Sequence, residues 1–167
     1  RAHRIVFNKG KIAPYNAWKM SFKNESAVYN NFLTGVGGVL YPPHCLDKNI
    51  LNESEFLELC PMADDIWIWA MAVKNHTKIH IINNSFSALN FVPGSQDGQC
   101  LWKTNTVEKC YNDEQLQNVL TRYPEVFYEV RRERLGNILL AYLLFPYYLF
   151  ACKYMRNKIK KQQQVKS

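Results

Sequence analysis

The sequence predicts an α/β domain followed by a basic helical segment, and three observations carry this prediction. Residues 1–7 alternate in polarity as a half-buried strand does. Residues 62–74 carry apolar side chains at helical spacing behind a Cys-Pro breaker. Residues 126–161 have a helical pattern interrupted only by a proline. We therefore expect one α/β domain over residues 1–125 and a helical C-terminal segment over residues 126–167.

Local signals delimit the first elements. The opening strand ends in Asn8-Lys9-Gly10-Lys11, which predicts a turn. A short helix is expected over residues 52–59, because Asn52 is a good N-cap and Glu55 stands three residues later, at the capping-box position. In the helix over residues 62–74, the apolar residues at helical spacing predict a buried face: Ile66, Trp69, Ala70 and Val73.

Local sequence signals also predict the elements in the second half of the domain. Residues 78–82 (Lys-Ile-His-Ile-Ile) predict a buried strand, in which His80 is expected to be a core histidine. Residues 83–110 are rich in Asn, Ser, Gly and Pro, which is typical of a long surface loop. A further helix is expected from Asp113, as its cap, to about Arg122.

Charge and composition narrow the function classes. The 167 residues are 47% hydrophobic and 21% charged, an ordinary globular composition that excludes a disordered or collagen-like chain. The net charge is +7, yet nine basic residues stand from Arg131 onward against the single acid Glu133, so the rest of the chain is close to neutral. A basic end around an apolar run favours an anionic membrane surface over a nucleic acid as partner.

The cysteines indicate the compartment. Five are present, with no Cys-x-x-Cys pair, so the sequence offers neither a zinc knuckle nor a redox motif. Their odd number argues against a closed disulfide framework. A reducing, cytoplasmic location fits best.

Two motifs carry the candidate chemistry. The first is a glycine-rich segment, Thr34-Gly35-Val36-Gly37-Gly38-Val39-Leu40-Tyr41-Pro42-Pro43, which allows close approach of a ligand or another backbone. The second is the start of the helix at residues 62–74, which reads Ala63-Asp64-Asp65-Ile66-Trp67-Ile68-Trp69. A packed glycine turn and helix N-capping by the aspartates are the structural alternatives.

In this order and spacing, the two motifs resemble the C-terminal half of a GT-A-type glycosyltransferase, closest to bacterial enzymes related to the family-two group. Residues 101–102 and 112–115 also look like that group, and the resemblance covers residues 1–124. It implies a partial GT-A (Rossmann-like) fold whose N-terminal, nucleotide-binding half is missing, with residues 1–125 as the acceptor-side half. It also implies transfer of a sugar from a nucleotide-sugar to a glycan or lipid-linked acceptor in surface polysaccharide synthesis. The isolated chain is expected to be inactive.

The resemblance assigns roles to individual residues. Asp65 matches the position of the catalytic base of an inverting transfer, and Asp64 is expected to bind acceptor hydroxyls or orient the site. Trp67 or Trp69 is expected to stack on a sugar face. The remaining substrate-binding candidates lie in the glycine-rich segment: Thr34, Gly35, Gly37 and Gly38.

The resemblance further implies a divalent metal, Mn²⁺ or Mg²⁺, held against the diphosphate by an Asp-x-Asp motif. That motif does not precede the glycine-rich segment here, so most ligands are expected outside this chain. His44, His76 and His80 are each possible third ligands, and spacing singles out none of them.

Two other classes remain open. A metal-dependent hydrolase would use Asp64, Asp65 and a histidine, but such enzymes usually need more ligands at close spacing. A membrane-associated sugar-binding module without catalysis would use the glycines and tryptophans as a binding surface.

The C-terminal segment has its own alternatives. Residues 138–152 form an uncharged, almost wholly apolar run that is shorter than the roughly 20 residues of a membrane span and contains Pro146. Basic residues flank both sides, which favours an interfacial or re-entrant anchor at the cytoplasmic face. A helix packed on the domain is the competing hypothesis.

Overall fold

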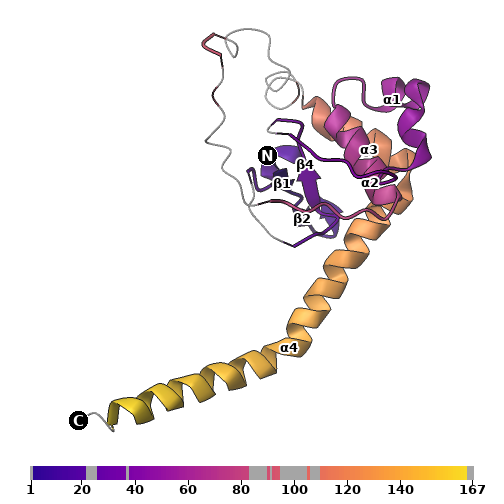
Figure 1. Ribbon diagram of the computed structural model, residues 1–167. Helices are drawn as coiled ribbons and strands as arrows, with labels where there is room; N and C mark the ends of the chain where they lie inside the picture. Colours follow the sequence, from indigo (N-terminus) through magenta and orange to yellow (C-terminus); the bar gives the residue numbers. More distant parts are fainter. Residues whose placement is uncertain are drawn as a thin grey trace. The chain divides into compact units, whose positions relative to one another are not determined.

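The computed structural model describes residues 2–21, 26–36, 38–82, 90, 92–94, 105 and 110–164, with side chains up to residue 144 and at residue 146 in the last helix. Its internal contacts divide the chain into two compact units, which we call the body (Arg1–Arg131) and the tail (Arg132–Ser167). Over the described residues the fold is mixed α/β, with four α-helices and two small antiparallel sheets (Figure 1).

The strands are short and pair in twos. β1 (Ala2–Arg4) runs antiparallel to β4 (Asn31–Leu33), with Ala2 opposite Leu33. β2 (Phe7–Asn8) and β3 (Lys11–Ile12) form a hairpin. Its turn is closed by Lys9 and Gly10, both at positive φ, which confirms the predicted turn.

Two short 3₁₀-helices, η1 (Tyr15–Ala17) and η2 (Lys48–Leu51), precede the α-helices. α1 (Glu53–Leu59) begins as predicted: the Asn52 side chain accepts from the Glu55 N–H, and its amide donates to the Glu55 carboxylate at 2.9 Å. α2 (Asp64–Lys74) buries all four residues expected on its inner face. The capping box therefore located α1, and helical periodicity located α2.

α3 (Tyr111–Arg122) starts two residues before the expected cap. Cys110 is the N-cap, and Asp113 lies in the first turn, where its carboxylate accepts from the backbone N–H of Tyr15 at 2.7 Å. α4 (Pro124–Gln164) begins at a proline, which suits the first helical position because its missing N–H has no partner there. The helix continues through Pro146.

The core of the body is built around α2, which packs against β4, η2 and α3 (Figure 1). Trp69 is fully buried and contacts Phe32 of β4, with ring centroids 5.9 Å apart. Its indole N–H donates to the carbonyl oxygen of Tyr29 at 2.9 Å. α3 and the first turns of α4 complete this core through Val119 and Val126.

One expected element is wrong. Residues 78–82 do not form a strand: Ile79 makes an isolated bridge with Val28, and His80 is exposed. The alternation of isoleucines is real, but the segment finds a single backbone partner instead of a sheet. Most of the long loop expected over residues 83–110 lies outside the described residues. The α/β class is confirmed, whereas a parallel Rossmann-like sheet is not among the strands that are described.

Candidate functional site

The site begins at the first turn of α2. Ala63 is the N-cap and makes no side-chain hydrogen bond to the free N–H groups of the helix, and two carboxylates stand in the first turn. Negative charge at this end is stabilised by the helix dipole. Asp64 is exposed and Asp65 is half-buried. Because Ile66 and Trp69 anchor the inner face of the helix, the acidic start is held at the edge of the core.

The glycine-rich segment meets this helix start. The backbone N–H of Gly35 donates to Asp65 Oδ1 at 2.9 Å, across 30 residues of sequence. The segment then turns, since the N–H of Gly38 donates to the Gly35 carbonyl at 3.1 Å. Gly38 has φ +91°, a conformation that L side chains rarely adopt. The two motifs therefore lie in contact, while Gly37 lies outside the described residues.

Tyr41 is a neighbour that the sequence reasoning missed. It is 40% exposed. Partial burial raises the pKa of its hydroxyl, and the negative charges of Asp65 and then Asp64 raise it further. The direction of this pKa shift shows that the Tyr41 hydroxyl lies close enough to both carboxylates to feel their charge. Its only signal in the sequence is a position at the end of the glycine-rich segment.

Three other predicted residues are placed differently. Trp67 and Trp69 are only 3% and 0% exposed, and their indole N–H groups donate to the carbonyl oxygens of Ile50 and Tyr29. Neither ring offers a face to a sugar, so the stacking role is wrong for both. Trp69 lies on the predicted inner face of α2 and packs on Phe32, whereas Trp67, about 200° around the helix, packs between Phe56 and Tyr123. Thr34 is 3% exposed, which also removes its side chain from the substrate surface.

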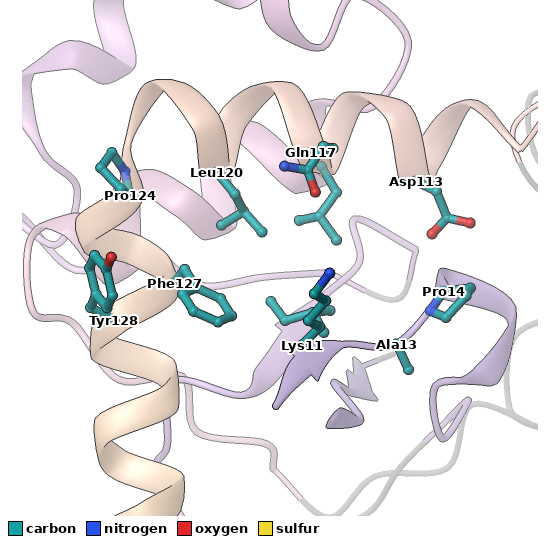
Figure 2. Close-up of a pocket in the computed structure, with 11 residues that line it drawn as sticks. Lys11, Ala13, Pro14, Asp113, Gln117, Leu120, Pro124, Phe127 and Tyr128 are labelled. Atoms are coloured by element: carbon teal, nitrogen blue, oxygen red, sulfur yellow. The ribbon is translucent and has the colours of Figure 1, made fainter. Parts of the chain in front are cut away.

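A cavity of about 490 Å³ lies elsewhere in the body and contains none of the predicted site residues. Figure 2 shows Asp113 and Gln117 of α3 facing Lys11 and Ala13, with Phe127 of α4 at one end. Its lining is mainly apolar. We assign the candidate site to the Gly35–Asp65 contact, because the two carboxylates and the glycine turn lie there.

The metal candidates do not converge. Within the part of the chain that the structure describes, no three His, Cys, Asp or Glu side chains form a group suited to a metal ion. His44, His76 and His80 are all exposed. His76 approaches Glu129 of α4, with Nδ1 and Oε2 4.0 Å apart. The residues that the structure describes therefore do not by themselves supply a donor set for a divalent metal.

Comparisons with protein-family models, with curated proteins and with solved structures found no match for this chain.

Proposed function

We propose that the chain is the acceptor-side part of a glycosyltransferase that moves a sugar from a nucleotide-sugar to a glycan or lipid-linked acceptor in surface polysaccharide synthesis. The observation that supports it is the hydrogen bond from Gly35 to Asp65, which joins the glycine turn to an acidic helix start. The partial GT-A fold is part of the same proposal.

In this proposal Asp65 is the general base of an inverting transfer. Its carboxylate takes the proton of the acceptor hydroxyl while the acceptor oxygen bonds to the anomeric carbon. The bond from that carbon to the nucleotide diphosphate breaks on the opposite face, and the diphosphate leaves with the electron pair. The Gly35 N–H fixes the direction of the carboxylate, so that little reorganisation is needed during the reaction.

The neighbours of Asp65 have supporting roles. Asp64 is exposed beside it and would accept hydrogen bonds from other acceptor hydroxyls. Tyr41, whose hydroxyl lies close enough to both carboxylates for their charge to raise its pKa, would donate to the acceptor or to a carboxylate. A divalent metal bound to the complete protein would neutralise the diphosphate, but no step above uses one, because the described residues lack a fitting donor set.

We place the reaction in the cytoplasm, at the inner face of the membrane. Cys45 and Cys60 carry free thiols, which suits a reducing compartment.

Asp65→Asn tests the base, and the chain contains a matched control. Asp113 also lies in the first turn of a helix and also accepts from a distant backbone N–H. Asparagine keeps an acceptor oxygen at either position but cannot take a proton. In the full natural protein, Asp65→Asn should lower turnover by about 100-fold or more, with donor affinity little changed. Asp113→Asn should leave turnover within a few-fold.

The assay measures nucleoside diphosphate release from a panel of UDP-, GDP- and dTDP-sugars in the presence of lipid-linked acceptors. Retained turnover in Asp65→Asn would show that the carboxylate only ties the glycine turn to the helix. Equal losses in both variants would point to a general effect on folding instead.

A further inference from the structure

We propose that the tail is an interfacial membrane anchor for anionic lipid, an inference that goes beyond the proposed chemistry and does not depend on it. The observation is a helix surface on which large apolar side chains are exposed and no side chain is charged. Between residues 135 and 144 the large apolar side chains are 39–75% exposed. They are Leu135, Ile138, Leu139, Leu140, Tyr142, Leu143 and Leu144.

These side chains surround the helix. Successive residues of an α-helix are about 100° apart, so residues 138–144, which contain no charged or amide side chain, cover the full circumference. An amphipathic helix docking on a protein would show one apolar stripe and a polar opposite face. A helix that is apolar all round needs an environment that is apolar on several sides, and lipid provides it.

Length decides how the helix meets the bilayer. Residues 138–152 carry no charge, and as a helix they extend over about 22 Å, against about 30 Å of hydrocarbon. Correspondingly, none of the helices, as far as they are described, has an apolar stretch long enough to cross a membrane. The run therefore enters the hydrocarbon from one side of the bilayer without crossing it, and both of its basic flanks stay at the headgroups of that side.

The basic residues on both sides of the apolar run favour anionic lipid. Arg131, Arg132 and Arg134 stand before the apolar run, and five basic residues follow it by residue 161. Both flanks thus favour an anionic headgroup layer, each basic residue near the surface strengthening binding by about fivefold at low salt. The same charges oppose the pairing of two parallel copies of this helix, because like charges would meet at both ends. A lipid surface is therefore favoured over a second copy.

The test is co-sedimentation of the whole chain with vesicles of phosphatidylcholine, with or without phosphatidylglycerol. Leu139→Gln/Leu143→Gln should weaken binding at least tenfold, because it places amides in the apolar run. The matched control is Leu51→Gln/Leu57→Gln, which changes two exposed leucines of the body and should leave binding unaltered.

Charge is tested separately. Arg132→Gln/Arg134→Gln should weaken binding to the phosphatidylglycerol vesicles by about 25-fold and leave the weak binding to neutral vesicles unchanged. Lys9→Gln/Lys48→Gln removes the same charge from the body and should have little effect. Raising the salt concentration should weaken wild-type binding without abolishing it.

Two outcomes would overturn the anchor. Equal vesicle binding by Leu139→Gln/Leu143→Gln and the wild type would mean that the apolar run does not reach lipid. Concentration-dependent self-association that disappears in the same variant, without vesicle binding, would assign the surface to a second copy. A second variant, Tyr142→Trp, keeps the run apolar and therefore tests lipid contact without the risk that added amides misfold the chain. The fluorescence of the new tryptophan should be quenched by brominated lipid. Absence of that quenching also counts against the proposal.

Discussion

Trp69→Phe separates a core tryptophan from a ligand-stacking one. Trp69 is completely buried, and its indole N–H donates to the Tyr29 carbonyl at 2.9 Å. Phenylalanine removes this donor from a buried carbonyl, which costs about 1–3 kcal/mol, and leaves a void worth about 1 kcal/mol. We expect the free energy of unfolding to fall by about 2–4 kcal/mol and the melting temperature by roughly 5–15 °C.

The measurement is urea unfolding followed by far-ultraviolet circular dichroism, which does not depend on tryptophan fluorescence. Trp67→Phe is the matched control, since its indole N–H makes a longer bond, 3.3 Å, to the Ile50 carbonyl. Its loss should be about 1–2 kcal/mol smaller, because a longer bond contributes less. The reasoning is refuted if Trp69→Phe is no more destabilising than Trp67→Phe.

Two further predictions concern charge and backbone. The hydrogen bond from the Tyr123 hydroxyl, aided by Arg122, holds the pKa of the Glu55 carboxyl below its ordinary value. This stabilisation is therefore complete above the unfolded-state pKa of about 4.3 and is lost as the pH falls below it, so Glu55→Gln should flatten the acid limb of stability measured by urea unfolding from about pH 6 to pH 3. Gly38→Ala should destabilise the fold by about 1 kcal/mol through its positive φ alone, because a Cβ there meets nothing within 4 Å. Gly136 lies inside α4, where alanine is a better helix former than glycine, so Gly136→Ala should raise the helicity measured by circular dichroism. A stabilising Gly38→Ala, or a Gly136→Ala with lower helicity, would contradict these two expectations.

Helices were predictable because their signals are local. The capping box at Asn52 and Glu55 and the apolar spacing of α2 each act within one or two turns, and the structure places both elements within two residues of the expected bounds. The strand predicted over residues 78–82 was wrong for the opposite reason: strand formation depends on a distant partner. A strand exists only if another strand pairs with it, and Ile79 finds only Val28. Polarity alternation contains no information about that partner.

The two tryptophans show a second limit. Aromatic residues near a carboxylate pair fit both a sugar platform and a core, and closeness to the carboxylates in the sequence does not distinguish the two. Helical spacing decides: Trp69 lies on the same face as Ile66 and Val73, and all three are buried. Trp67 is held between Phe56 and Tyr123, with ring centroids 6.2 and 6.0 Å away. Tyr41 is a better candidate than either tryptophan for a role beside the carboxylates. Its position there depends on how the glycine turn folds back, which the sequence does not show.

The two acidic helix starts of the body differ in what their hydrogen bonds accomplish. Asp113 accepts from Tyr15, the first residue of η1, and satisfies a partly buried N–H that the short helix leaves without an internal partner. Asp65 accepts from Gly35 in an exposed setting, where water would satisfy the same N–H. Folding therefore needs the first bond more than the second. A carboxylate that is oriented where folding does not demand it, beside a protonated Tyr41, is the stronger candidate for chemistry.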